Sequence, residues 1–118
     1  MMMMQVNSDT PGAWMTSGPG AQRRILCESA ELMMVEFRFE KDGRGLPHYH
    51  PHVQTTYVTS GLFRFTVSGE TRDLGPGDAM LIPSDAEHSC LCLEEGVLID
   101  SFTPRRDDFM EAHGLPMR

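Results

Sequence analysis

The chain has 118 residues, and its 10 Lys and Arg residues against 17 Asp and Glu residues give a formal net charge of -7. This length favours one domain with one core, and the scattered basic residues argue against a nucleic-acid partner. No apolar run reaches the roughly 18 residues that span a bilayer, and the four leading methionines lack the features of a signal peptide. We therefore expect a soluble, cytoplasmic protein with no membrane partner.

The N-terminal segment, residues 1–22, is expected to form a flexible arm. Its second half, residues 10–20, is rich in Gly, Pro and Thr and has no hydrophobic periodicity, which is typical of poorly ordered segments. Trp14 is the exception, because a free arm would leave its large aromatic ring exposed to water. We predict that Trp14 packs on the main domain or on a second subunit.

Residues 23–104 are expected to form the folded domain. Apolar and polar side chains alternate in residues 33–39 and 63–67, which is the signature of strands with one buried face. Further strands are expected at 55–59, 70–74, 79–82, 88–93 and 97–102, with turns at 60–61, 68–69, 75–78 and 94–96. Strands at intervals of about 8 to 12 residues predict an all-β fold, either an antiparallel sandwich or a barrel. Only the tail, residues 105–118, offers a short helix, within 105–112.

Three histidines and a glutamine are candidate metal ligands. His48 and His50 are two residues apart, so both side chains leave an extended segment on one face, and Gln54 shares their parity. His88 follows a second apolar run, where a closed barrel would bring it opposite the first pair. Imidazole nitrogens and an amide oxygen form a neutral ligand set that leaves the metal's charge free to polarise a bound oxygen. We predict one divalent transition metal ion, with Zn, Ni, Mn, Fe and Co as candidates.

The cysteines allow two interpretations. Their number is odd, which indicates reduced thiols rather than a disulfide framework. Cys90 and Cys92 share the parity of His88 on one expected strand, so both thiols are expected on the face of that imidazole. Either they fill the barrel interior as small apolar side chains, or a thiolate joins the metal ligands.

The first histidine stretch resembles the first of the two motifs of the cupin superfamily. Four residues keep its spacing: His48, His50, Gln54 and Gly61. Gln54 stands where the motif usually has Glu, and Asp42 stands where it opens with Gly.

The second stretch resembles the second cupin motif. Gly77, Pro83 and His88 keep its spacing, whereas Asp85 replaces a Gly and Cys92 replaces an Asn. The resemblance covers about residues 31–102. It implies a single cupin barrel, which is a double-stranded β-helix of the jelly-roll type.

Three further residues are candidates for contact with a substrate. Asp100 lies between apolar residues of equal parity on the last expected strand, and a carboxylate facing inward there needs a partner or carries protons. Arg106 follows closely, and its guanidinium suits a substrate carboxylate in bidentate fashion. His52 has the parity of the ligands, but Pro51 favours a local bulge. We therefore interpret His52 as a residue that supports the metal ligands or lines the pocket, rather than as a direct ligand.

Together these residues resemble the small single-domain cupins of pectin and alginate breakdown. Those proteins convert a cyclic 4,5-unsaturated uronate monosaccharide to the linear keto acid, so the resemblance implies an isomerase-like enzyme with a small acidic sugar as substrate. By position, it implies that the metal is held by His48, His50, Gln54 and His88. It also implies that Asp100 moves the proton, Arg106 binds the carboxylate and Phe102 walls the pocket.

Two other functions fit the same residues. A cupin-type metal-dependent dioxygenase would need a redox-active ion with open positions for oxygen. A non-catalytic cupin would bind a small molecule or a metal without turnover. Small single-barrel cupins commonly pair through edge strands, so a homodimer is expected in either case.

Overall fold

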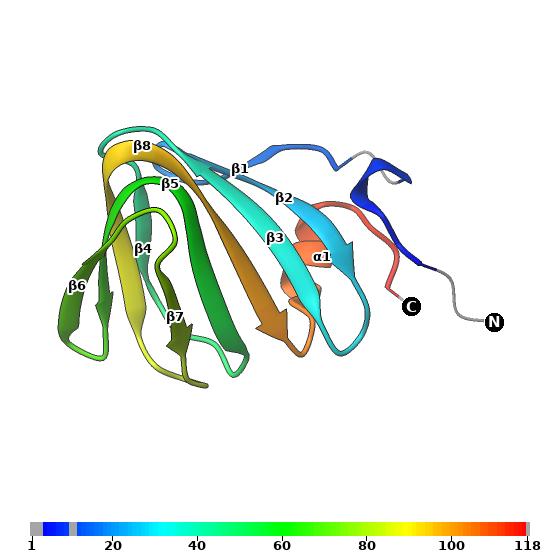
Figure 1. The fold of residues 1–118 in the computed structure, drawn as a ribbon. Helices are drawn as coiled ribbons and strands as arrows, with labels where there is room; N and C mark the ends of the chain where they lie inside the picture. Colours follow the sequence, from blue (N-terminus) through cyan, green and yellow to red (C-terminus); the bar gives the residue numbers. More distant parts are fainter. Residues whose placement is uncertain (1–3, 10–11, 118) are drawn as a thin grey trace.

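The computed structural model describes residues 4–9 and 12–117. Within these residues the elements in chain order are η1 (Asn7–Asp9), β1 (Met15–Gly18), β2 (Ala21–Glu28), β3 (Met33–Phe39), β4 (Arg44–His48), β5 (Val53–Val67), β6 (Glu70–Leu74), β7 (Ala79–Ile82), β8 (His88–Thr103) and α1 (Asp107–Ala112). The antiparallel sheet runs in the order β1-β2-β3-β8-β5-β6, while β4 pairs with β8 and β7 pairs with β5. Figure 1 shows this sheet as strongly curved, with α1 beside β2 and β3. The predicted all-β barrel class is confirmed.

The two long strands, β5 and β8, connect both halves of the barrel. The first half of β5 pairs with β7 and its second half pairs with β6, while β8 pairs with β5 along most of its length. The prediction of turns at 60–61 and 94–96 was wrong, because the chain stays in strand conformation there and only the register of the β5–β8 pair shifts. Glycine explains the difference: a Cβ on Gly96 would lie 2.1 Å from the Ser60 carbonyl oxygen. The glycines therefore let the two paired strands approach closely at this register shift without turning.

The sheet begins earlier than the sequence indicated. β1 and the first residues of β2 lie within residues 1–22, the segment expected to form an arm, because a turn at Gly20, with φ of 64°, folds β1 back onto β2. The Trp14 ring packs on the barrel, with the guanidinium carbons of Arg24 and Arg38 at 5.0 and 4.0 Å from its centroid. This confirms the first of the two predicted positions for Trp14. Residues 1–3, 10 and 11 of the expected arm lie outside the described residues.

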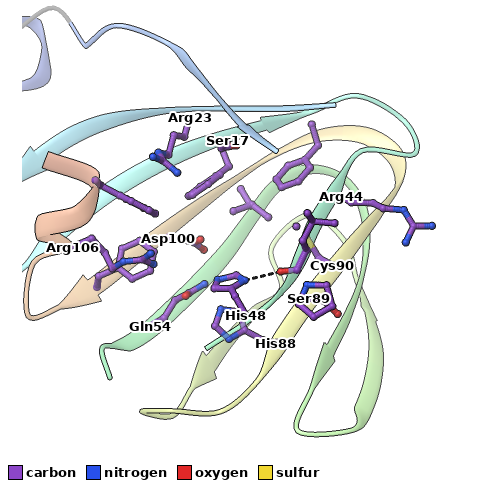
Figure 2. A pocket seen from close by; sticks show the side chains of 18 of the residues that line it. Ser17, Arg23, Arg44, His48, Gln54, His88, Ser89, Cys90, Asp100 and Arg106 are labelled. Atoms are coloured by element: carbon purple, nitrogen blue, oxygen red, sulfur yellow. Dashed lines mark hydrogen bonds between the residues drawn. The ribbon is translucent and has the colours of Figure 1, made fainter. Parts of the chain in front are cut away.

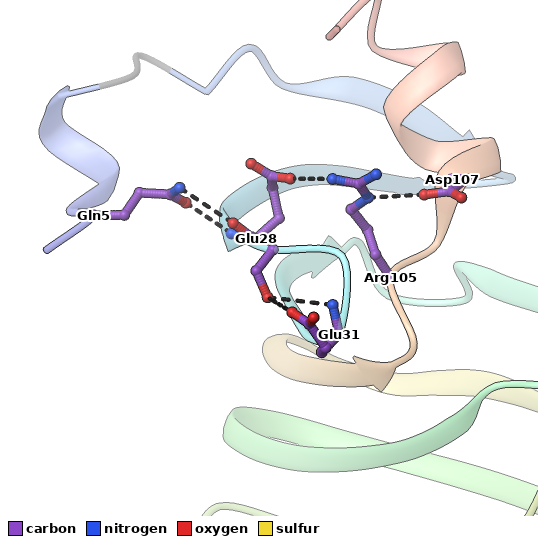
Figure 3. Close-up of polar contacts among 6 residues, drawn as sticks. Gln5, Glu28, Glu31, Arg105 and Asp107 are labelled. Carbon is purple, nitrogen blue, oxygen red and sulfur yellow. Dashed lines mark hydrogen bonds and ion pairs between the residues drawn. The ribbon is translucent and has the colours of Figure 1, made fainter. Parts of the chain in front are cut away.

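The predicted C-terminal helix is confirmed as α1, which an ion-pair cluster ties to the barrel. Arg105 precedes α1, and its guanidinium donates to Glu28 Oε1 and to Asp107 Oδ1, both at 2.8 Å. The Gln5 side chain in turn bonds both backbone groups of Glu28, as Figure 3 shows. The cluster fixes the start of α1 against the end of β2. Among the described residues, no helix has the length and apolar character needed to cross a bilayer.

The core divides into two apolar clusters. One lies among the strands and contains Ala21, Phe39, Val58, Phe63, Phe65, Leu74, Cys92 and Leu98. The other lies between α1 and the sheet and contains Ile25, Met33, Val35, Phe102, Phe109 and Met110. Phe37 packs against both clusters. The expected alternation in residues 33–39 is observed, since Met33, Val35 and Phe39 are buried while Met34 and Arg38 are exposed.

Candidate metal centre and cavity

The structure brings the three candidate histidines together. His48 ends β4, His88 begins β8, and the two residues lie directly opposite in the β4–β8 pair. His50 follows in the connection to β5. One ligand atom from each of the three lies within 4.8 Å of the others. Gln54 reaches the group from β5, with its Oε1 3.0 Å from His50 Nε2. Figure 2 shows His48, His88 and Gln54 grouped on one side of the cavity.

The ring nitrogens are oriented for metal binding. In each of the three imidazoles Nδ1 faces a backbone carbonyl oxygen: that of Leu46 at 2.7 Å, of His52 at 3.1 Å and of Ala86 at 2.9 Å. A carbonyl only accepts, so these contacts place the ring proton on Nδ1 and leave Nε2 with its lone pair. His88 Nε2 is buried and has no hydrogen-bond partner. Buried polar atoms normally have partners, and a histidine that donates Nδ1–H to a carbonyl is the usual metal-ligand arrangement.

Burial keeps two of these imidazoles neutral. It lowers the pKa of His88 to about 4, and the neighbouring His48, His50 and Arg106 act in the same direction. Burial is also the main cause of a lowered pKa at His50, followed by the charge of Arg106. Because only a neutral imidazole is a ligand, these lowered pKa values favour the metal-binding form of both side chains. The donor set thus fits a transition metal ion.

Asp100 lies beside this group in the barrel interior. It is directly opposite Thr56 in the β5–β8 pair, and the Thr56 hydroxyl donates to its Oδ1 at 2.5 Å. Thr56 in turn accepts a 3.1 Å hydrogen bond from Gln54 Nε2. Burial raises the pKa of Asp100 to about 7, against the opposing effect of these two side chains and of Arg106. A carboxyl group that titrates near neutral pH is able both to accept and to donate a proton.

These groups line a cavity of about 500 Å³. Its wall includes Asp100, Phe102 and Arg106 together with the candidate ligands His48, Gln54 and His88. The Arg106 guanidinium is held in bidentate fashion by Asp108, with Nε–Oδ1 and Nη2–Oδ2 distances of 3.0 and 2.8 Å. It also lies over the rings of Phe102 and Phe109. A ligand carboxylate would therefore share Arg106 with Asp108.

Sequence reasoning missed two residues, Arg23 in the wall of this cavity and Thr56, which is hydrogen-bonded to Asp100. Arg23, on β2, lines the cavity and stacks on the Phe109 ring at 3.8 Å, and its nearest polar partner is His113 Nε2 at 3.2 Å. Among the described residues, no carboxylate forms an ion pair with Arg23. Arg23 is the first residue of the expected folded domain and belongs to neither histidine motif, so no sequence signal marked it. Thr56, by contrast, carried a signal, because it shares the inward parity of Gln54.

Three other candidates lie near the site without joining the metal ligands. His52 packs against Phe102, its Nε2 faces the Arg105 carbonyl oxygen at 3.2 Å, and it does not line the cavity. Cys90 lines the cavity, but burial raises its pKa to about 12, so it stays a neutral thiol. Cys92 is fully buried in the strand cluster. In the described part of the chain, the group that could hold a metal contains neither cysteine.

The fold and the site together define a cupin. The chain belongs to this family, since the family described as Cupin domain matches residues 35–99. It is 42% identical to the pectin degradation protein KdgF of Dickeya dadantii (strain 3937) over 107 residues, which cover 89% of this chain and 96% of that protein.

Two solved structures are similar as well. The structure of KdgF from Halomonas sp. matches with a TM-score of 0.81 and 37% identity, over 92% of this chain and 99% of that one. An RmlC-like cupin from Shewanella frigidimarina NCIMB 400 matches with a TM-score of 0.80 and 37% identity, over 83% and 88% of the two chains. The expected single cupin barrel is confirmed.

Proposed function

We propose that this protein is a metal-dependent enzyme that converts a cyclic 4,5-unsaturated uronate monosaccharide to the linear keto acid. The observation that carries the proposal is the buried carboxyl group of Asp100, which shares a cavity with His48, His88 and Arg106. The similarity to two KdgF proteins, one of them described as a pectin degradation protein, supports a substrate from pectin.

The metal would be held by His48, His50, His88 and Gln54. Bound there, it supplies a Lewis acid that orients and polarises substrate oxygens. The unpartnered Nε2 of His88 and the converging lone pairs of the group support this assignment. All four ligands are neutral, so the ion keeps its full charge for the substrate.

Proton transfer is assigned to Asp100. The reaction moves one proton from the anomeric hydroxyl to carbon 4, while the bond between carbon 1 and the ring oxygen breaks and carbon 5 becomes a carbonyl. Asp100 first takes the hydroxyl proton as a base and then delivers it to carbon 4 as an acid. Its pKa of about 7 suits both steps. No electrons are gained or lost overall.

Substrate binding is assigned to the guanidinium groups and the aromatic wall. Arg106 binds the uronate carboxylate while keeping contact with Asp108, and Arg23 adds a second positive charge on the same cavity. Phe102, which is 1% exposed, walls the pocket and helps to exclude water. An anionic sugar thus gains charge-assisted contacts that a neutral sugar lacks.

The test is an assay with unsaturated galacturonate. We expect the metal-loaded protein to speed the loss of the enol absorbance over the spontaneous rate. Asp100→Asn has nearly the same shape but carries no titratable proton, so it should lose at least about 100-fold in rate while metal analysis finds the ion still bound. If the metal-loaded wild-type protein gives no acceleration, the proposed function is wrong.

A further inference from the structure

Thr56 connects the candidate metal ligand Gln54 to Asp100. The Thr56 side chain is 0% exposed, and it lies between two buried polar neighbours on the inner face of the barrel. It accepts from Gln54 Nε2 at 3.1 Å and donates to Asp100 Oδ1 at 2.5 Å. A hydroxyl has one proton to donate, so both hydrogen-bonding directions at Thr56 are in use.

The direction of this chain fixes the Gln54 carboxamide. Because the hydroxyl proton of Thr56 points to Asp100, its oxygen presents a lone pair to Gln54, and only the amide nitrogen can donate to it. The carboxamide is planar, so its oxygen must point the other way. That oxygen lies 3.0 Å from His50 Nε2.

The two facing atoms are both acceptors. His50 Nδ1 faces the carbonyl oxygen of His52 at 3.1 Å, so Nδ1 carries the proton and Nε2 carries a lone pair. Two lone pairs that face each other without a proton are unfavourable, whereas a cation between them satisfies both. With the amide reversed, Gln54 would present N–H groups to His50 and could not bind a cation.

We propose that Thr56 is a positioning residue of the metal centre, which holds the Gln54 oxygen toward the three imidazoles and keeps Asp100 in register with them. The inference rests on the metal centre of the proposed function but not on the identity of the substrate. Thr56→Val removes the hydroxyl with little change in shape, so the Gln54 amide loses the contact that orients it. Thr56→Ser keeps the hydroxyl and is the matched control.

The experiment measures the Zn²⁺ affinity of the purified protein by competition with a chromogenic chelator. We expect Thr56→Val to bind Zn²⁺ at least about 10-fold more weakly than wild type, the effect usual for groups that orient metal ligands, and Thr56→Ser to stay close to wild type. The unfolding midpoint of each metal-free variant shows whether it is folded. Should Thr56→Val fail to fold, Thr56→Cys replaces it, because a thiol is a weak donor.

A double-mutant cycle separates positioning from a general structural effect. In a Gln54→Ala background there is no carboxamide to orient, so adding Thr56→Val should leave the Zn²⁺ affinity unchanged. The role of Thr56 is overturned, with the metal centre left standing, if Thr56→Val binds Zn²⁺ as tightly as wild type. It is also overturned if Thr56→Val weakens Zn²⁺ binding by the same factor in the wild-type and Gln54→Ala backgrounds. Wild-type protein without measurable Zn²⁺ affinity would overturn the metal centre and this inference together, whereas an inactive protein that binds Zn²⁺ overturns only the proposed substrate.

Discussion

At the scale of single residues, aspartate takes the place of glycine at two turns. Asp42 and Asp85 stand at glycine positions of the two cupin motifs, and they have φ values of 70° and 63°. This left-handed region favours glycine, and Asp is one of the few other residues found there. The backbone N–H of Asp85 donates to the His50 carbonyl oxygen at 2.8 Å. The turn at Asp85 therefore helps to place a candidate ligand in a distant part of the sequence.

Substitution of Asp85 tests this turn. Asp85→Ala puts a side chain with no local hydrogen-bonding ability at positive φ and should cost about 1 kcal/mol of unfolding free energy, whereas Asp85→Gly should be neutral or stabilising. Urea denaturation of the metal-free proteins measures both values. Equal stability of the two variants would show that the φ angle at this position carries no cost.

A second prediction at this scale concerns the pH dependence of stability. The pKa of Asp100 rises from 3.8 to about 7 in the folded protein, so between these values the unfolded chain binds fewer protons than the folded one. The contribution of Asp100 to the free energy of unfolding therefore falls by ~4 kcal/mol in total as the pH rises from about 4 to about 7. Relative to wild type, the Asp100→Asn variant should therefore gain ~4 kcal/mol of unfolding free energy as the pH rises from about 4 to about 7.

Urea denaturation in the presence of EDTA at several pH values checks this prediction. The lowered pKa values of His50 and His88 act in the opposite sense, because their neutral folded forms make stability rise with pH. Both histidines are present in wild type and variant, so the difference between the two proteins isolates Asp100. A difference that is constant with pH would contradict the assigned pKa.

At the scale of elements, the barrel depends on the antiparallel pairing of β5 and β8. These two strands carry Gln54, Thr56, His88 and Asp100, so their register sets the geometry of the site. The register shift near Ser60 needs glycine on both strands, since Cβ atoms on Gly61 and Gly96 would lie 2.5 Å and 2.1 Å from backbone oxygens of the opposite strand. The backbones of the two strands consequently lie closer together here than a Cβ atom permits.

Gly96→Ala is the corresponding test. The added methyl group forces the two backbones apart, and we expect a loss of about 3 kcal/mol, the upper end of the usual cost of overpacking. Gly75→Ala is the matched control, because its nearest atom is a Leu62 side-chain carbon at 3.8 Å. Thermal unfolding of both variants measures the effect, and equal midpoints would argue against close contact between β5 and β8 at Gly96.

At the scale of the whole molecule, the candidate ligands connect distant parts of the chain. They come from β4, the connection to β5, β5 itself and β8. A metal bound there would link both motifs and stabilise the folded state over the unfolded state. The homodimer expected from the sequence stays a prediction.

Metal removal should therefore lower the stability of the protein. With Zn²⁺ at about 100 times its dissociation constant, the folded state gains about 2.7 kcal/mol, and EDTA should abolish this gain. Unfolding midpoints with and without Zn²⁺ measure the shift, with His88→Ala as the variant that should not respond. A midpoint in wild type that is indifferent to both Zn²⁺ and EDTA would contradict a metal centre.

The sequence by itself determined most of the strands from residue 33 onward, their inward face and the candidate ligands, because alternation and spacing are local properties. His48, His50, Gln54 and His88 were identified by parity and motif spacing, and Asp100 by its place among apolar neighbours. Tertiary structure alone decided the rest, since it depends on contacts between distant segments. The close approach of β5 and β8 at Gly61 and Gly96 and the placement of Arg23 on the cavity both arise when separate elements pack together. The hydrogen-bonded chain through Thr56 forms only because β5 and β8 set Thr56 opposite Asp100.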